Sequence, residues 1–305
     1  MADDGTDIVA QGDLTQAVRE AAMLANVRIS MWGAERSDDA LMEKVKADAG
    51  AQGNVGRVVK NLLAGADGQL RDVHSAFRQV RAIHTQLTLP WVSDATAQRK
   101  TGPRLLPTLL WERYVTETGT QRRKALAALE TFLADYPDLC ARAQANLANM
   151  ASASEYPSVD DIRAAFAIRF DFEPIPSGQS FKGLPDHVLE RLGAALHQKQ
   201  QRMVAGATHA MWEQARDRVS HIAERLAAGD AKFKNSTVEA VRELVALLPG
   251  WNLNDDPRVA ELVADIERML AGVDATALRK DEGLRVSTAD KARALADKLA
   301  TWGLA

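Results

Sequence analysis

The chain contains a single cysteine, Cys140, among its 305 residues. One thiol excludes a disulfide within the chain, and it also excludes a zinc site built from several cysteine ligands. Cys140 follows Tyr136 and Pro137, where the pattern predicts the beginning of a helix. We therefore expect a buried free thiol that contributes packing and no chemistry.

The sequence also lacks the long apolar runs of membrane proteins. No stretch reaches the roughly eighteen apolar residues that a membrane-spanning helix requires. The opening residues, Met1-Ala-Asp-Asp, are acidic, whereas a signal peptide is first basic and then apolar. These absences predict a cytoplasmic protein.

Neither sign of charge dominates the chain. It has 38 Lys and Arg residues against 41 Asp and Glu residues, which gives a net charge of −3 and a pI of about 6.1. A protein with this balance has no overall basic field that would attract nucleic acid, although a local basic patch is compatible with it. The hydrophobic content of 46% and the charged content of 26% are typical of a soluble globular protein.

Motifs of the common catalytic sites are missing. The nucleophile motif Gly-x-Ser-x-Gly does not occur, and the stretch with Gly53 and Gly56 has neither the lysine nor the preceding strand of a phosphate-binding loop. Three pairs of adjacent aspartates lie at predicted helix starts, where capping and the helix dipole account for them. These pairs are Asp38-Asp39, Asp160-Asp161 and Asp255-Asp256. The sequence therefore predicts a protein that is not an enzyme and needs no cofactor.

The histidines do not form a metal site. His197, His209 and His221 are twelve residues apart on one predicted helix. Each step turns about 120° around the helix axis, so the three imidazoles share no face. His84 lies just before a loop with Pro90 and Trp91 and is the one histidine with a possible functional place; the alternative is a hydrogen bond at a helix end. We expect no bound metal.

Apolar periodicity predicts a mainly α-helical fold. Residues 67–87 show it best, because apolar positions recur every three or four residues and form one stripe. The stripe consists of Leu70, Val73, Phe77, Val80, Ile83 and Leu87. Further helices are predicted over residues 13–24, 37–50, 107–136, 137–151, 185–228, 236–251, 256–270 and 287–299.

Two segments alternate apolar and polar residues as a half-buried strand does. The first is residues 26–32. The second is residues 167–175, where Ile168, Phe170 and Phe172 share one face. Because no other strand is predicted, residues 27–32 should pair with residues 168–173 in a two-stranded antiparallel ribbon, with helices covering its apolar face.

After Pro185, residues 186–228 contain no further proline and only two glycines, so residues 185–228 predict one long helix. Leucines at 189, 192 and 196 continue to Met203 in a heptad-like rhythm, which then shifts toward Val219, Ile222 and Leu226. The pattern indicates a coiled-coil-like seam in which Lys199 extends its charge toward water. Two partners fit it: the helix over residues 107–136 folding back, which we favour, or a second subunit.

Three parts of the chain are predicted from these patterns. Residues 1–12 are acidic and offer little to bury, so they form a flexible tail. Residues 13–230 form a helical domain that contains the ribbon. Residues 231–305 form a small C-terminal helical bundle, joined at Gly229-Asp230. The fold class is thus an elongated helical bundle with long coiled-coil-like helices and a small β-ribbon.

Residues 87–114 combine chain-breaking prolines with an unusual amount of apolar side chain. Either the core of the protein or a partner must cover this area. Interface hot spots are enriched in tryptophan and arginine. The candidate partner-binding residues are Trp91, Arg104, Leu105, Leu106 and Trp111. The alternative is that the whole segment belongs to the core.

A basic cluster follows this segment in the sequence. Arg122, Arg123 and Lys124 are consecutive, and a second cluster contains Arg99 and Lys100. Together with the two tryptophans these charges could hold the phosphates and bases of a single-stranded nucleic acid. The alternative interpretation is a set of solvated helix and loop ends.

Six short motifs occur in a recognisable order. They are Val27-Arg-Ile-Ser-Met-Trp32, Ala82-Ile-His-Thr-Gln-Leu-Thr-Leu-Pro-Trp91, Arg104-Leu-Leu-Pro107, Phe132-Leu-Ala-Asp-Tyr-Pro137, Tyr156-Pro-Ser-Val-Asp-Asp-Ile-Arg163 and Arg169-Phe-Asp-Phe-Glu-Pro-Ile-Pro176. Together they resemble a family of phage and prophage proteins catalogued as a domain of unknown function, over roughly residues 20–200.

The resemblance implies an accessory role. Members of that family are often encoded near MoxR-type AAA+ ATPases and proteins with a von Willebrand A-type domain. It implies a phage protein that works in the host cytoplasm by protein–protein interaction, with such an ATPase or another phage or host protein as its partner. The oligomeric state stays open, and the family supplies no site residues to carry over.

Overall fold

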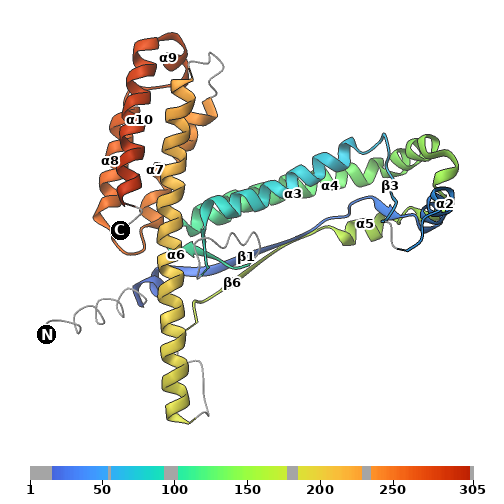
Figure 1. The fold of residues 1–305 in the computed structure, drawn as a ribbon, viewed down its shortest axis with the longest axis horizontal. Helices are drawn as coiled ribbons and strands as arrows, with labels where there is room; N and C mark the ends of the chain where they lie inside the picture. Colours follow the sequence, from blue (N-terminus) through green and yellow to red (C-terminus); the bar gives the residue numbers. More distant parts are fainter. Residues whose placement is uncertain (1–15, 54–55, 93–101, 177–184, 229–234, 303–305) are drawn as a thin grey trace. The chain divides into compact units, whose positions relative to one another are not determined.

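The computed structural model describes residues 16–53, 56–92, 102–176, 185–228 and 235–302. This part of the chain is mainly α-helical with two small sheets, as predicted for the fold class (Figure 1). The helices are α2 (Asp39–Ala49), α3 (Gly68–Leu87), α4 (Trp111–Leu147), α5 (Val159–Ala165), α6 (Asp186–Ala227), α7 (Asn235–Trp251), α8 (Pro257–Leu270), α9 (Ala275–Lys280) and α10 (Glu282–Trp302). The strands are β1 (Ala22–Ser30), β2 (Glu35–Ser37), β3 (Val59–Asn61), β4 (Leu89–Pro90), β5 (Arg104–Pro107) and β6 (Ala167–Glu173). Short 3-10 helices are η1 (Thr108–Leu110), η2 (Ala148–Met150) and η3 (Ala153–Glu155).

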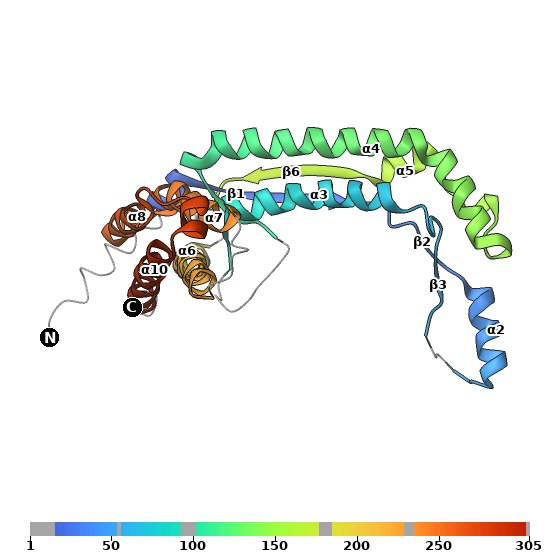
Figure 2. The same cartoon turned by 90° about the horizontal axis from the view of Figure 1, so that it is seen from above.

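The larger sheet has the strand order β4-β5-β1-β6. The predicted pairing of the two alternating segments is confirmed, because β1 and β6 are neighbours and run in opposite directions (Figure 2). The prediction of a lone two-stranded ribbon is wrong, because β5 pairs antiparallel with β1, placing Ala22 opposite Pro107 and Ala25 opposite Arg104. Accordingly, the helix predicted over residues 13–24 is helical only over 16–21, and Asp13 lies outside the described residues.

The chain divides into two compact units. The first unit comprises Met1–Asn26, Thr85–Tyr114 and Asp171–Ala305, and the second comprises Val27–His84 and Val115–Phe170. This grouping differs from the expected division at residue 230, because α7 and α10 pack against α6 within the first unit. The proposed tail and the proposed junction at Gly229-Asp230 fall outside the described residues.

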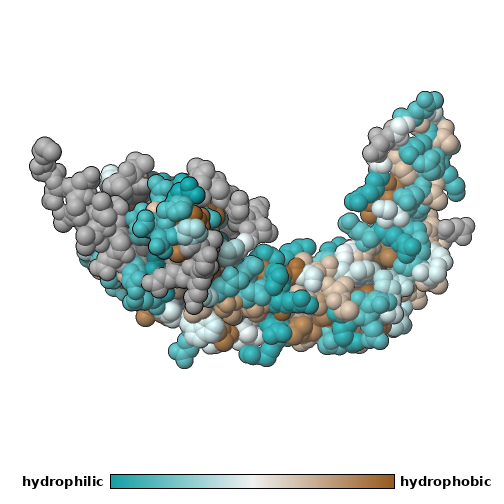
Figure 3. All heavy atoms as spheres, turned by 90° about the horizontal axis from the view of Figure 1, so that it is seen from below, coloured by the Kyte–Doolittle hydropathy of each residue, from teal (hydrophilic) through white to brown (hydrophobic). Residues whose placement is uncertain are grey.

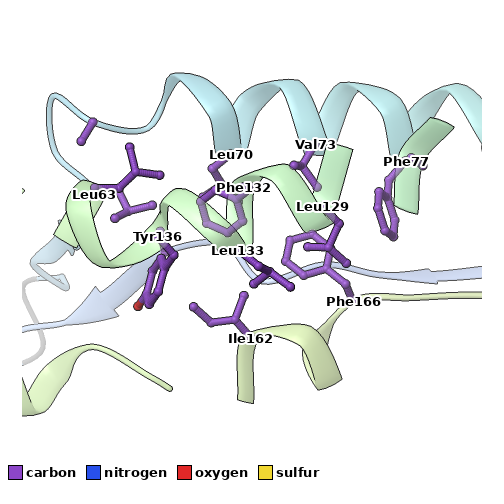
Figure 4. Close-up of a cluster of buried hydrophobic side chains, with 14 of the residues drawn as sticks. Leu63, Leu70, Val73, Phe77, Leu129, Phe132, Leu133, Tyr136, Ile162 and Phe166 are labelled. Atoms are coloured by element: carbon purple, nitrogen blue, oxygen red, sulfur yellow. The ribbon is translucent and has the colours of Figure 1, made fainter. Parts of the chain in front are cut away.

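The core of the second unit is built around the predicted stripe of α3 (Figure 4). Leu70, Val73, Phe77 and Val80 are all buried, as expected. The stripe packs with side chains of α4 and of the α5 region, which are Leu129, Phe132, Leu133, Tyr136, Ile162 and Phe166. Aromatic side chains close the end of this core, where Trp32 meets Tyr136 edge to face at 5.9 Å.

Helix α4 continues through a proline that was expected to end it. Residues 107–136 and 137–151 were predicted as two helices, but α4 runs from Trp111 to Leu147 with Pro137 inside. A proline within a helix removes one backbone hydrogen bond. Here Leu133, Tyr136 and Leu139 are buried on both sides of it, so packing outweighs the lost bond. Cys140 is a buried free thiol, as predicted, and burial raises its pKa.

The predicted helix caps are confirmed. Asp38 accepts a hydrogen bond from the backbone N–H of Leu41 at the start of α2, and Asp256 accepts one from Arg258 at the start of α8. At α5, Ser158 is the N-cap and Asp161 completes a capping box. These bonds satisfy N–H groups that a helix start would otherwise leave without partners.

A buried lysine, Lys60, joins the elements around the smaller sheet. The sequence analysis did not predict this ion-pair cluster. Strands β2 and β3 form this sheet, and Lys60 of β3 is nearly inaccessible. Its ammonium lies 2.8 Å from Glu155 and 3.1 Å from Asp38, and it donates to the carbonyl of Met150. The hydrogen bond with Glu155 raises the pKa of Lys60, and Lys60 lowers the pKa of Glu155. A buried charge without such partners would be strongly unfavourable.

Helix α6 has two halves with different surroundings. The C-terminal half, residues 200–227, buries a continuous face that includes Met211, Val219, Ile222 and Leu226. Helices α10 and α7 pack against this face. The prediction that the helix over residues 107–136 packs there is therefore wrong. In the N-terminal half, residues 186–199, Leu192 is 37% exposed, so the predicted burial of the seam is wrong there. The long helix itself is confirmed.

Candidate protein-binding surface

Three of the predicted partner-binding side chains belong to the interior of the first unit. Leu105 and Leu106 of β5 are fully inaccessible, and Trp91 is only 7% exposed. Strand β5 lies between β4 and β1, so both of its edges are occupied. The expectation that these three residues contact a partner is therefore corrected: they anchor the segment to the core.

Arg104 also turns inward. Its Nε donates to the hydroxyl of Thr88 at 2.7 Å, and its Nη2 donates to the carbonyls of Thr88 at 2.7 Å and Thr85 at 3.3 Å. These carbonyls lie at the C-terminal end of α3. Backbone C=O groups at a helix end have no N–H partner within the helix. Burial lowers the pKa of the guanidinium to about 10. Arg104 thus caps a helix end, and its donors are engaged within the chain.

Trp111 is the predicted residue that remains on the surface. It begins α4 and is 38% exposed. Its indole meets the ring of Phe172, at the end of β6, edge to face at 5.0 Å. Phe172 is 40% exposed, and it also meets the buried ring of Tyr114 at 6.0 Å. Phe172 therefore contacts both the exposed indole of Trp111 and the buried ring of Tyr114.

The neighbouring leucines of η1 point in opposite directions. Leu110 is buried against Gly250 of α7, where a Cβ would come within 2.7 Å of the Leu110 side chain. Leu109 is 80% exposed, the highest exposure among the large hydrophobic residues described. We refer to the ring pair of Trp111 and Phe172, with the exposed Leu109 two residues before Trp111 in the chain, as the apolar patch. Sequence reasoning missed Leu109 and Phe172, because periodicity identifies apolar residues without showing which of them lack cover.

Residues close to the apolar patch in the sequence are held by polar contacts within the first unit. Arg113, two residues after Trp111 on α4, forms an ion pair with Glu243 of α7. The amide of Gln86 donates to the same carboxylate at 3.2 Å. Burial of Tyr114 raises the pKa of its phenol. Since the surrounding side chains are already fixed, a partner would order little of this surface when it binds.

Exposed apolar side chains also occur elsewhere on the described surface, and one of them, Val115, follows Trp111 by one turn of α4. Figure 3 shows one face of the molecule, on which hydrophobic residues appear in small groups between hydrophilic ones. Single exposed hydrophobic residues are normal in soluble proteins. The apolar patch differs because two of its aromatic rings are in direct contact.

The predicted basic cluster lies in the second unit. Arg122, Arg123 and Lys124 are exposed on α4. Arg123 donates to the hydroxyl of Thr120 at 3.0 Å. The second cluster, with Arg99 and Lys100, falls outside the described residues. Since Trp91 is buried, it is not available as a stacking platform for bases.

Two of the described histidines have defined surroundings. His84 is buried, and His209 pairs with Glu213 at 3.4 Å. Within the described ranges, no three His, Cys, Asp or Glu side chains are grouped so that they could hold a metal ion. None of the described helices has the length and apolar character needed to cross a membrane.

A pocket of about 370 Å³ lies between α8 and α10. Its rim carries Arg268, Lys291 and Lys298, and its floor includes Leu295. Asp265 pairs with Lys298 at 2.7 Å and with Arg268 at 3.0 Å. Lys298 also pairs with Glu261 at 2.5 Å, so two carboxylates balance two of the three cations, and the ion pairs of Lys298 join α8 to α10.

Comparisons with known protein families, with curated proteins and with solved structures find no match. The function proposed for the chain consequently depends on its own residues and on the motif resemblance described above.

Proposed function

We propose that this chain is a non-enzymatic phage accessory protein that acts by binding another protein through the apolar patch. The supporting observation is the exposure of Leu109, Trp111 and Phe172, together with the contact of the Phe172 ring with the buried ring of Tyr114. Aromatic side chains that stay exposed on a rigid surface are common interface anchors. Their burial by a partner would contribute binding energy at a low entropic cost.

The proposed partner is a MoxR-type AAA+ ATPase in the cytoplasm of the host cell. The motif resemblance supports this choice, because relatives of the resembled family are often encoded beside such ATPases. Other phage or host proteins are the remaining candidates. In each case the patch would bind an apolar surface, since Leu109, Trp111 and Phe172 offer almost no hydrogen-bonding groups.

The test uses the full chain and a purified MoxR-type ATPase from the genome that encodes it. Binding is measured by biolayer interferometry for the wild type, for Leu109→Asp and for Phe172→Ala. A carboxylate at residue 109 would have to be desolvated in the complex, so Leu109→Asp should weaken binding on the order of tenfold or more. Its melting temperature should stay unchanged, because the native leucine is mostly in water.

The matched control is Val286→Asp, which introduces the same charge at another exposed apolar residue of the first unit. It should bind as the wild type does. Equal binding by Leu109→Asp and Val286→Asp would contradict the proposal, and so would the absence of binding by the wild type to the ATPase.

A second candidate function is binding of single-stranded nucleic acid. The observation that favours it is the exposure of three consecutive cations, Arg122, Arg123 and Lys124, on α4. A gel-shift titration at rising salt would detect it, because each phosphate contact steepens the salt dependence of binding. Replacing all three cations by glutamine should then reduce both the affinity and the salt dependence. A shift that all three substitutions leave unaltered would rule out this cluster.

A further inference from the structure

The N-terminal half of α6 presents an apolar face. Leu189, Leu192 and Leu196 are three and four residues apart, so they lie on one side of the helix. Leu192 is 37% exposed, and the other two leucines are half-buried. The first buried residue of α6 is Gln200, whose Oε1 accepts a hydrogen bond from Arg19 at 3.2 Å. Full burial of side chains along α6 therefore begins where this half ends.

The exposed half is stable as a helix because it continues a packed one. An isolated helix of about fourteen residues is marginal in water. Residues 200–227 are fixed by α7 and α10 and supply the helical nucleus for the residues before them. Figure 1 shows α7, α8 and α10 beside the upper part of α6, whereas no labelled helix of the first unit accompanies its lower end. The N-terminal half of α6 therefore stays helical, and its leucine face is ordered although it is not fully buried.

We propose that the N-terminal half of α6 pairs with the same segment of a second copy of this chain in an antiparallel arrangement. The distribution of charge supports both the partner and the direction. Asp186 precedes the leucines, Glu190 and Arg191 lie between Leu189 and Leu192, and Lys199 and Arg202 follow Leu196. Antiparallel pairing brings the acidic end of each helix to the basic end of the other. Parallel pairing would place like charges together.

The register follows from the leucines. If Ala194 lies at the two-fold axis, Leu192 packs against the partner's Leu196, and Leu196 packs against the partner's Leu192. Leu189 then faces the aliphatic stem of the partner's Lys199, whose ammonium reaches water at the edge. Gly193 and Ala195 flank the axis, and no atom lies within 4 Å of the position of a Cβ on Gly193. These small residues allow the two helices to approach closely.

The first experiment is sedimentation equilibrium on the full chain over a range of concentrations. The wild type should be a reversible dimer. Leu196→Asp should raise the dimer dissociation constant on the order of tenfold or more, because the dimer would bury an unpaired charge. Val286→Asp and Leu109→Asp should leave the constant unchanged, which separates this surface from the apolar patch. A wild type that is monomeric at all concentrations would overturn the proposal, as would equal dissociation constants for Leu196→Asp and Val286→Asp.

The second experiment fixes the direction of the pair by thiol cross-linking. The native thiol is removed by Cys140→Ala, and single cysteines are introduced by Ala195→Cys or Asp186→Cys. In the antiparallel register, the two copies of residue 195 lie beside the axis, whereas the two copies of residue 186 are about 24 Å apart along it. A short bismaleimide should cross-link Ala195→Cys and fail to cross-link Asp186→Cys. Efficient cross-linking of both would show a parallel pair, and cross-linking of neither would exclude this interface.

Discussion

The two halves of α6 carry similar apolar rhythms and have different surroundings. Residues 200–227 bury Met211, Val219 and Ile222 completely, while residues 186–199 leave Leu192 partly in water. The difference arises from the elements that reach each half. Trp302, near the end of α10, meets Trp212 of α6 at 5.6 Å, so this cover reaches only the C-terminal half. An apolar stripe therefore shows which side of a helix requires cover, and its neighbours decide how much of that side receives it.

The largest predicted contrast compares two side chains on the same helix. Met211→Ala should reduce the free energy of unfolding by about 2–5 kcal/mol, because it leaves a cavity under α10 and α7. Leu192→Ala should change it by less than about 0.5 kcal/mol, as surface substitutions usually do. Urea unfolding of dilute protein, below the concentration of any dimer, measures both. Comparable losses would mean that the two halves are equally buried.

Two glycines of α6 give the next contrast. A Cβ on Gly206 would lie 2.6 Å from the carbonyl oxygen of Val92, which is backbone and cannot rotate away. Gly206→Ala should therefore cost about 1–3 kcal/mol. Gly193 has open space around it, so Gly193→Ala should stabilise the monomer by about 0.5–1 kcal/mol through helix propensity. Thermal unfolding compares them, and a stabilising Gly206→Ala would contradict the close approach of Val92.

The boundary between the halves can be located with adjacent polar residues. Gln200 is buried and bonded to Arg19, whereas Lys199 is exposed. Gln200→Ala should lower the free energy of unfolding by about 1 kcal/mol, because the substitution removes the hydrogen bonds of a buried side chain with Arg19 and with the carbonyl of Pro176. Lys199→Ala should have almost no effect on the monomer. If Lys199→Ala were the more damaging substitution, the boundary would lie nearer to the start of the helix.

Acid should weaken the packing of α8 against α10, which belong to the same unit as the covered half of α6. We expect this loss of stability to be smaller than the losses from the substitutions above. The hydrogen bond from Lys298 lowers the pKa of Asp265, and this pair joins α8 to α10. Because the carboxyl has a lower pKa when folded, its stabilising contribution is present above the ordinary aspartate pKa of about 3.9 and is lost as the pH falls through the lowered value. Asp265→Asn should reduce the loss of stability between pH 5 and the acid limit of roughly pH 2. An acid transition that the substitution leaves unaltered would assign the effect to other carboxylates.

Local patterns predicted the elements whose cover comes from nearby residues. The stripe of α3 identified its buried side, and the alternation of residues 167–173 identified β6. The pairing of β5 with β1 could not be predicted, since prolines mask the strand pattern of Arg104–Pro107 and its partner is about eighty residues earlier. The prediction that a helix ends before Pro137 was wrong for a related reason. The packing that keeps α4 continuous comes from other elements, which the local sequence does not show.

The candidate surface was predicted only in part. Trp111 was identified by its type and context, but the same reasoning selected Trp91, Leu105 and Leu106, which are buried. Composition is alike for an interface and a core, so it cannot separate them. Leu109 and Leu110 show this best. They are adjacent and identical, yet Leu109 is exposed and Leu110 is buried against Gly250.

The interleaving of the two units along the chain has a consequence for synthesis on the ribosome. The second unit is complete in sequence once residue 170 has been added, whereas the first unit also needs residues 171–305. Segments Met1–Asn26 and Thr85–Tyr114 must therefore wait for the rest of their unit, which includes α6 and α7, the helices that contact β4 and η1. Apolar strands that wait in this way are exposed to aggregation. A nascent chain that stops short of α10 should consequently be the form that chaperones hold longest.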